Sequence, residues 1–111
     1  MEKVLIVQTT FSDKDEAVEF AKKILLARLA ACIQLSGEAE SFYWWKGAIE
    51  KDQEIIVTMK TMETLYPQLE AYITKIHSYE TPEILATTVK HVGSGYLQWL
   101  HEELGGEKKK Q

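Results

Sequence analysis

Residues 31–60, ACIQLSGEAESFYWWKGAIEKDQEIIVTMK, contain the pattern that decides the fold. Apolar and polar side chains alternate over residues 31–45, and the alternation returns over residues 55–60. A period of two is typical of a β-strand, and the Lys-Gly pair at residues 46–47 is typical of a turn between strands. Gly37 interrupts the first arm and predicts a bulge or bend there. The segment therefore predicts a long β-hairpin.

Strands and helices alternate on both sides of this hairpin. Residues 3–10, KVLIVQTT, and residues 84–92, ILATTVKHV, are rich in β-branched side chains and predict strands. Apolar side chains recur at spacings of three and four from Ala17 to about Arg28, which predicts a helix. The same spacing predicts a second helix over residues 65–76.

Polar side chains stand where these helices are expected to begin. Ser12 or Asp13 is placed to cap the first helix, and Thr61 or Thr64 to cap the second. Ser94 is placed to cap a further short helix, GYLQWLHEEL.

The predicted order is β-α-β-β-α-β, followed by the short helix. This is the order of the ferredoxin-like fold, in which two helices cover one face of a four-stranded antiparallel sheet. We therefore predict an α+β, ferredoxin-like βαββαβ sandwich with a long central hairpin and an extra C-terminal helix. A single domain is expected over residues 1–104, since one core commonly occupies about 100–200 residues. Residues 105–111, GGEKKKQ, are expected to form a flexible polar tail.

Composition excludes several classes of partner. The chain has 111 residues, 45% of them hydrophobic and 27% charged, as in an ordinary soluble globular protein. No apolar run approaches the ~18 residues that span a bilayer, so no membrane partner is expected. The net charge of −4 argues against a nucleic-acid partner, which requires a clustered basic face. The single cysteine, Cys32, and the absence of a secretory signal pattern lead us to expect a cytoplasmic protein.

The aromatic run SFYWWKG, residues 41–47, raises the question of assembly. Strand alternation places Phe42 and Trp44 on one face, and Tyr43 and Trp45 on the other. Two helices cover only one face of the sheet, so about half of these rings are expected to be exposed, as at a partner surface. Closed self-association would cover them together with the free hairpin edges. The alternative is that the rings complete the core of a single chain.

The segment HSYETPE, residues 77–83, contains candidate metal ligands. The imidazole of His77 and the carboxylates of Glu80 and Glu83 suit borderline divalent metals such as Cu(II) or Zn(II). Pro82 biases the residue before it to extended geometry, so the three do not have to share a helical face. The alternative is structural: the segment ends a helix, with His77 facing the last carbonyls and Glu83 accepting from backbone donors.

Two further residues have both a chemical and a structural interpretation. Cys32 lies among small apolar residues, where a free cysteine commonly acts as a small hydrophobe, but its thiolate would also suit Cu(I). Lys60 would bind a small anion, or form an ion pair with Glu80 or Glu83. Motifs of the GxSxG, GxGxxG, P-loop and HExxH types are missing from the sequence, so we expect no enzymatic activity.

Five segments in order resemble the CutA family, the divalent-cation tolerance proteins: TTFSDKDEA (9–17), LARLAACIQ (26–34), SFYWWKGAIEKDQEIIVTMKT (41–61), HSYETPEIL (77–85) and GYLQWL (95–100). The resemblance implies a ferredoxin-like protomer in a homotrimer, a role in metal tolerance, and binding of copper and other divalent ions. The trimers of this family are similar to PII signalling proteins. That similarity implies an alternative, a signalling trimer that binds a small anionic ligand at the inter-subunit cleft.

The family's cleft motifs map onto a limited set of residues in this chain: Cys32, Trp45, Gly47, Lys60, Thr61, His77, Tyr79, Glu80, Pro82 and Glu83. Among them the resemblance implies His77, Glu80, Glu83 and Cys32 as metal ligands, and Lys60, Trp45 and Tyr79 as contacts of a small ligand. Ser78 stands where the family usually has a proline.

Overall fold

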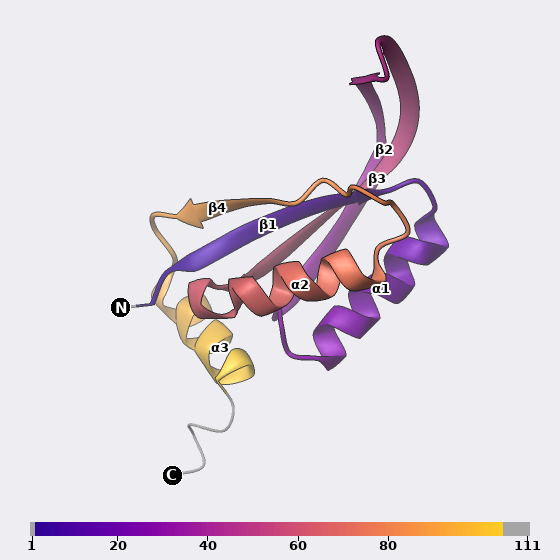
Figure 1. The fold of residues 1–111 in the computed structure, drawn as a ribbon. Helices are drawn as coiled ribbons and strands as arrows, with labels where there is room; N and C mark the ends of the chain where they lie inside the picture. Colours follow the sequence, from indigo (N-terminus) through magenta and orange to yellow (C-terminus); the bar gives the residue numbers. More distant parts are fainter. Residues whose placement is uncertain (1, 106–111) are drawn as a thin grey trace.

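The sheet that the alternating pattern predicts is present in the computed structural model, which describes residues 2–105. Its elements are β1 (Val4–Phe11), α1 (Lys14–Leu26), β2 (Cys32–Trp45), β3 (Ala48–Met62), α2 (Tyr66–Ile76), β4 (Leu85–Val89) and α3 (Ser94–Leu104), with a 3₁₀ turn, η1 (Glu63–Leu65), before α2. The strand order is β2-β3-β1-β4, and every neighbouring pair is antiparallel (Figure 1). The α+β, ferredoxin-like prediction is thereby confirmed.

One face of the sheet packs against α1 and α2. Alternate residues of β1 and β3, such as Val7 and Val57, point to this side and are fully buried. Phe20 and Ile24 of α1 and Ile73 of α2 meet them from the helices. The period of two in the strands and the spacing of three and four in the helices therefore build one hydrophobic core.

Within residues 2–105, the opposite face of the sheet is covered only at one end. Leu100 of α3 packs there on Val4 of β1 and Met62 of β3, in a second small cluster. Strand register places the remaining side chains of this side in rows, and we call them the open sheet face: Ile6, Gln8, Cys32, Gln34, Ile56, Thr58, Lys60, Leu85 and Thr87. Most of these side chains are partly or fully exposed.

The start of α1 has the side-chain cap that the sequence predicts. Asp13 has extended backbone geometry, and its carboxylate accepts a hydrogen bond of 2.9 Å from the Glu16 N–H. This bond satisfies one of the unpaired N–H groups in the first helical turn. Of the two predicted caps, Ser12 and Asp13, the aspartate is therefore the correct one.

Replacing Asp13 by alanine is expected to lower the free energy of unfolding by about 0.5–2 kcal/mol, because the Glu16 N–H loses its acceptor. Urea unfolding at fixed protein concentration measures the loss. Asp15→Ala is the matched control, since it removes an acidic side chain from the same helical turn and leaves the cap in place. Equal losses in the two variants would show that charge alone, and not the capping bond, stabilises this helix end.

The predicted caps of the other two helices are wrong. Leu65 and Gly93 occupy the cap positions of α2 and α3, and neither offers a side-chain hydrogen bond. Thr61 is instead buried, and its hydroxyl donates to the Leu29 carbonyl at 2.7 Å. Thr64 bonds to Glu2 rather than to the backbone of α2. The η1 turn enters α2 directly, so a threonine cap has no place there.

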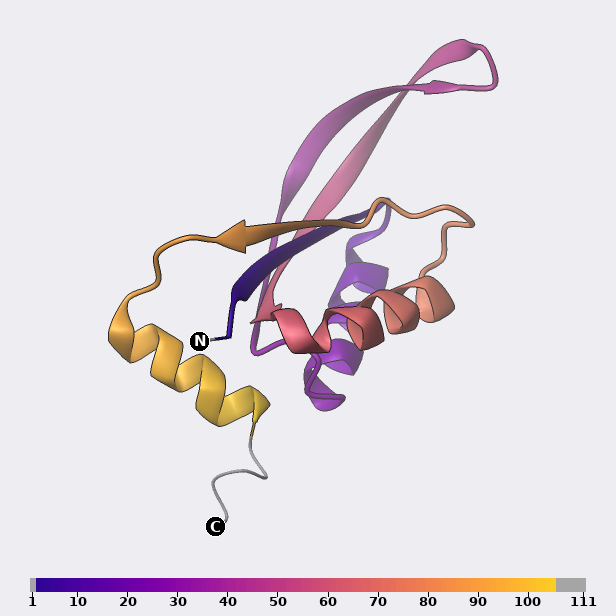
Figure 2. The same cartoon turned by 60° about the vertical axis from the view of Figure 1, so that its left-hand side comes forward.

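The hairpin of β2 and β3 projects well beyond the rest of the domain (Figures 1 and 2). Lys46 and Gly47 form its turn with positive φ values of 51° and 83°, a region that favours glycine. The register shifts between Ser36 and Ala39, so the bulge predicted at Gly37 is confirmed. The radius of gyration, 15.2 Å, exceeds the roughly 13 Å of a compact chain of this length.

The polar tail predicted over residues 105–111 lies outside the described residues, apart from Gly105, which is buried at the C-terminal cap of α3. Within residues 2–105, no helix has the length and apolar character needed to cross a membrane.

Candidate functional site

His77 ends α2 and is buried against the sheet. Its ring stacks on Phe11 with centroids 4.0 Å apart and an interplanar angle of 11°. Nδ1 accepts a hydrogen bond of 3.0 Å from the Tyr79 N–H. Nε2 therefore carries the proton and donates to the Thr10 carbonyl at 2.8 Å. Both ring nitrogens are engaged, so the imidazole links the loop after α2 to the end of β1.

The environment of His77 favours its neutral form. Burial lowers the pKa of His77, while the Thr10 carbonyl and the carboxylates of Glu16 and Glu54 oppose this shift only in part. The unfolded chain therefore binds a proton at this residue more readily than the folded chain does. Stability from this residue is complete above the ordinary histidine pKa of about 6.5, and it falls as the pH drops below that value.

We expect the urea concentration at the unfolding midpoint to decrease when the pH is lowered from 7.5 to 5.5. We expect His77→Phe to remove most of this dependence on pH. The phenyl ring keeps the contact with Phe11 but has no group that titrates. His91→Phe is the control, because His91 is exposed, and it is expected to keep the wild-type slope. An unchanged slope in His77→Phe would contradict the assignment of a neutral, buried imidazole.

Tyrosine hydroxyls and carboxylates connect the loop after α2 to the base of the hairpin. Tyr79 donates to Glu54 at 2.9 Å, and Thr10 donates to the same carboxylate at 3.2 Å. Further along the hairpin, Tyr43 donates to Asp52. Burial, and next the bond to Glu54, raise the pKa of Tyr79 to about 12. The bond to Asp52 raises the pKa of Tyr43 to about 12, so both hydroxyls keep their protons at neutral pH.

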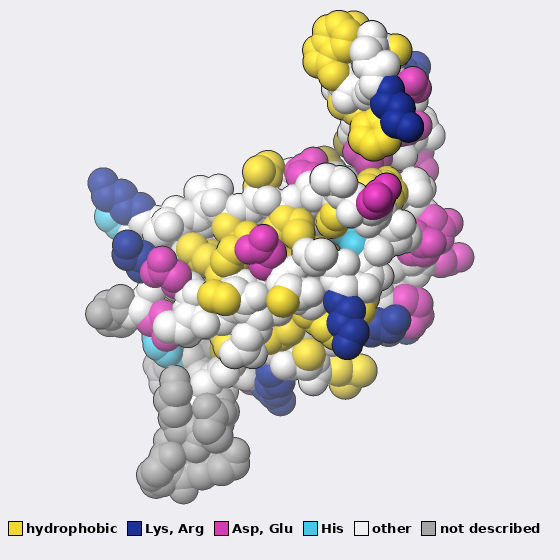
Figure 3. All heavy atoms as spheres, in the orientation of Figure 1, with side chains coloured by type: hydrophobic (Ala, Val, Ile, Leu, Met, Phe, Trp, Pro, Cys, Tyr) yellow, Lys and Arg dark blue, Asp and Glu magenta, His cyan; other side chains and the backbone are white. Residues whose placement is uncertain are grey.

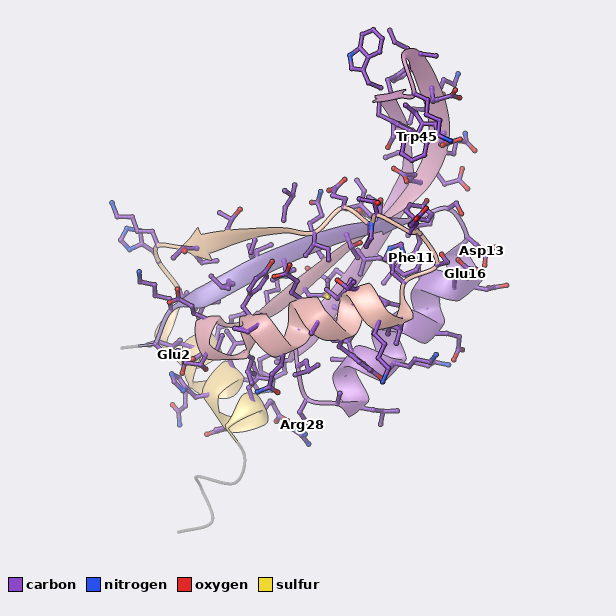
Figure 4. The ribbon with its side chains drawn as sticks, viewed as in Figure 1. Glu2, Phe11, Asp13, Glu16, Arg28 and Trp45 are labelled. Carbon is purple, nitrogen blue, oxygen red and sulfur yellow. The ribbon has the colours of Figure 1, made fainter. Side chains whose placement is uncertain are left out.

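A surface cleft of about 490 Å³ opens beside this network, between the hairpin and the loop. We call it the aromatic cleft. Its lining residues are Ser12, Tyr43, Trp45, Asp52, Glu54, Tyr79, Glu80 and Thr81. Figure 4 shows Trp45 on the projecting hairpin, above Phe11 at the end of β1.

The four predicted metal ligands do not meet within one chain. Cys32 aligns with Lys60 and so with Ile6, on the open sheet face. His77 packs on the other face, beside Phe11, five residues further along β1, or roughly 16 Å at strand spacing. Among residues 2–105, no group of three or more histidine, cysteine, aspartate or glutamate residues is arranged to hold a metal ion.

The other predicted ligands lie at the surface. Glu83 is exposed and accepts a hydrogen bond of 2.9 Å from the Gln8 amide, rather than from backbone donors. Glu80 is exposed and lines the aromatic cleft. Cys32 is half-buried beside Tyr96, whose pKa is raised by burial and, to a smaller extent, by Cys32.

The three residues assigned to a small ligand are divided between two places. Trp45 and Tyr79 both line the aromatic cleft. Lys60 does not line it; its ammonium donates to the Gln34 side chain on the open sheet face. The ion pairs expected between Lys60 and Glu80 or Glu83 are absent from the described part of the chain.

Ser78, at the position where the resemblance implies a proline, has a partner of its own. Its hydroxyl donates to Glu16 of α1 at 3.0 Å. The loop that contains His77 is therefore fixed to α1 through Ser78 and to β1 through His77. A hydrogen bond from the serine hydroxyl therefore helps to hold the loop, whereas a proline ring would restrict its backbone.

Sequence reasoning missed the hairpin carboxylates, Asp52 and Glu54. A signal for them was present, because Glu50, Asp52 and Glu54 alternate along β3 with a period of two. They therefore share one face, and the register places Tyr43 of β2 opposite Glu50 on that same face. An acidic stripe facing tyrosine and tryptophan on the paired strand predicts the aromatic cleft.

The fold and the cleft together define a small ferredoxin-like protein with a projecting β-hairpin. Residues 5–103 match the family described as CutA1 divalent ion tolerance protein. The chain belongs to this family.

Individual relatives agree with this assignment. The divalent-cation tolerance protein CutA of Pyrococcus horikoshii is 42% identical over 100 residues, which cover 90% of this chain and 97% of the relative. The protein of the same name from Thermotoga maritima is 38% identical over 101 residues, covering 91% and 99% of the two chains. The crystal structure of CutA1 from Oryza sativa superimposes with a TM-score of 0.88 at 32% identity, covering 91% of this chain and 93% of that one.

Proposed function

We propose that this chain acts as a non-enzymatic homotrimer that binds a divalent metal cation, copper foremost, in metal-ion tolerance in the cytoplasm. Family membership supports the link to divalent cations. The observation that carries the proposal is the exposure of apolar surface that a single chain leaves uncovered. Phe42, Trp44 and Ile49 are 64%, 73% and 63% exposed. We call these three side chains the apolar hairpin face; hydrophobic groups gather at the hairpin tip in Figure 3.

The alternative in which the rings complete the core of a single chain is wrong, since all four hairpin rings are exposed. Exposed apolar surface on a projecting arm is typical of a partner site. The partner that fits is a second copy of the chain, because the open sheet face is also uncovered and has free apolar groups such as Leu85.

The locations of the two surfaces favour a ring of copies over a symmetric dimer. The apolar hairpin face and the open sheet face are different surfaces on different parts of the chain. A contact between unlike surfaces is head-to-tail, and it closes into a ring when the rotation permits. Three copies is the number that the family resemblance implies.

The metal part of the proposal depends on the assembly. The donors of one chain do not fit a metal ion together, because both nitrogens of His77 are engaged and Cys32 lies on the other face of the sheet. Glu80 and Glu83 are the exposed carboxylates closest to His77 in the sequence. We therefore propose a metal site shared between copies, in which these carboxylates contribute oxygen ligands of the kind that Cu(II) accepts.

Titration calorimetry with copper(II) chloride on the full chain tests this proposal. Wild type is expected to bind, and Glu80→Gln combined with Glu83→Gln is expected to bind at least about tenfold more weakly, since each change removes a charged ligand. Glu63→Gln, an exposed carboxylate outside the segment, is the control. Absence of copper binding by wild type would overturn the metal proposal. Unchanged copper binding by His77→Ala or Cys32→Ser would show that the replaced residue is not a metal ligand.

Small-anion binding is a second candidate, supported by Lys60. This cation is half-buried on the open sheet face, and its ammonium is paired with the neutral Gln34 amide rather than with a carboxylate. An anion bound between two copies of the chain would pair with the charge of the Lys60 ammonium. Nucleotides and organic acids are expected to raise the melting temperature of wild type but not of Lys60→Ala. Equal shifts in both proteins would contradict a role for Lys60.

A further inference from the structure

The strand pairing changes by one residue where the hairpin leaves the body of the sheet. In the body, Ser36 of β2 pairs with Ile56 of β3, whereas further out Ala39 pairs with Glu54. Three steps along β2 therefore match two steps along β3, so β2 has one extra residue around Gly37. Such an extra residue is a β-bulge, and it moves the side chains that follow it to the other face of the sheet. We call the part of the hairpin beyond this bulge the arm.

The bulge decides which side of the sheet the rings of the arm occupy. Cys32, before the bulge, lies on the open sheet face. In a regular strand Phe42 and Trp44 would share that face, because an even number of positions separates them from Cys32. After the bulge, Trp44 pairs instead with Ile49, which alternates along β3 in step with Val57 of the core. The apolar hairpin face therefore lies on the side of the sheet where α1 and α2 lie.

Side-chain contacts agree with this assignment of faces. Lys51 Nζ is 5.8 Å from the centroid of the Phe42 ring, as expected for paired residues on one face. On the other face, Glu54 accepts a hydrogen bond of 3.2 Å from Thr10, and Thr10 alternates along β1 in step with Ile6 of the open sheet face. The apolar hairpin face and the open sheet face therefore point to opposite sides of the sheet.

The space around the bulge requires a glycine. A Cβ atom on Gly37 would lie 2.9 Å from Ile55 Cδ1 and 3.4 Å from the Glu54 carbonyl oxygen. The first distance is shorter than the roughly 3.5–4.0 Å at which two carbon atoms pack well. Glycine therefore allows β2 to approach β3 closely at the point where the faces are exchanged.

Opposed apolar surfaces restrict the way in which copies of the chain can assemble. A two-fold contact joins the same patch of both copies. One such contact covers either the apolar hairpin face or the open sheet face, and it leaves the other surface in water. A head-to-tail contact covers both, because the hairpin of one copy lies on the open sheet face of the next. If both surfaces lay on one side of the sheet, a single two-fold contact could cover both.

We propose that the Gly37 bulge selects the ring over the two-fold pair. It turns the apolar hairpin face away from the open sheet face, so that the occupant of the open sheet face is the hairpin of a second copy in a head-to-tail contact. This inference rests on the assembly in the proposed function, and it adds the structural element that decides the symmetry of that assembly.

Two length variants separate the bulge from the faces that it sets. A threonine inserted between Glu54 and Ile55 gives both strands equal numbers of residues, so it removes the bulge and moves the apolar hairpin face to the open side. Deletion of Gly37 also removes the bulge, but it leaves every ring on its present face. Sedimentation equilibrium at micromolar concentration is expected to give three times 12.7 kDa for wild type and for the deletion, and twice 12.7 kDa for the insertion.

A pair of substitutions tests the same point without changing the length of either strand. Ser41→Phe combined with Phe42→Ser moves one ring to the other face and keeps the composition of the chain. About tenfold more protein, or more, is expected to be needed for this variant to form three copies. Ser41→Phe alone is the control, because it adds the same ring but keeps Phe42 in place, and it is expected to assemble as wild type does.

Three results would overturn the proposal. These are three copies for the insertion variant with wild-type circular dichroism, a single-chain mass for the Gly37 deletion, and undiminished assembly of the double substitution. The double substitution decides the question if the insertion variant does not fold, because it leaves the strand pairing unchanged. A single-chain mass for wild type would contradict the proposed assembly itself. Failure of the assembly and failure of the role of the bulge are therefore distinguished.

Discussion

Replacing Phe42 and Trp44 by serine is expected to split the proposed trimer into single chains. Both rings belong to the apolar hairpin face, and they are 64% and 73% exposed in one chain. A large aromatic ring that becomes buried at the centre of an interface commonly contributes about 2 kcal/mol or more. Loss of both rings therefore weakens each subunit contact by roughly 10³-fold. Light scattering on the eluting protein measures the change in mass.

The control for this pair is Leu26→Ser. Leu26 is 84% exposed, but it lies at the end of α1 and not on the hairpin. Its replacement removes an apolar group from the surface and is expected to leave the mass of the assembly unchanged. A trimeric Phe42→Ser, Trp44→Ser variant would show that the hairpin rings are not the subunit contact.

Leu100→Ala is expected to cost about 2–5 kcal/mol of unfolding free energy, the range for removing a fully buried leucine side chain. Leu100 is the buried residue of α3, and it packs on Val4 and Met62 at the covered end of the sheet. A cavity there loosens the contact that holds α3 to the sheet. Arg28 adds a second attachment, because its guanidinium donates to the Glu103 carbonyl at 2.7 Å and to the Glu103 carboxylate at 2.8 Å.

Urea unfolding at one fixed protein concentration measures the loss in Leu100→Ala, because the stability of an oligomer depends on concentration. Hydrogen exchange locates it, and faster exchange is expected in the amides of α3 than in those of α2. Leu26→Ala is again the exposed control, and a change within about 0.5 kcal/mol is expected for it. A Leu100→Ala variant as stable as this control would contradict the packing of α3 on the sheet.

The parts of the fold that could be predicted are those in which one local pattern decides the structure. The alternation over residues 31–45, the Lys46-Gly47 turn and the interruption at Gly37 gave the hairpin, its turn and its bulge. The spacing in α1 and the carboxylate of Asp13 gave that helix and its cap. In each case the deciding atoms lie within a few residues of one another.

Tertiary contacts decided the features that were missed. Thr61 is suited to a cap by type, but the Leu29 carbonyl, 32 residues away in the sequence, takes its hydroxyl. His77 is suited to metal binding by type, but its Nε2 already donates a hydrogen bond to the Thr10 carbonyl at the end of β1. The aromatic cleft required the register of the hairpin and the position of the loop after α2 together.

The molar mass of the wild-type chain in solution tests the central proposal most directly. The apolar hairpin face and the open sheet face are uncovered in one chain, and three copies would cover them. Sedimentation equilibrium at micromolar concentration is expected to give three times the 12.7 kDa of one chain. A mass of 12.7 kDa would contradict the proposed assembly, and with it a metal site shared between copies.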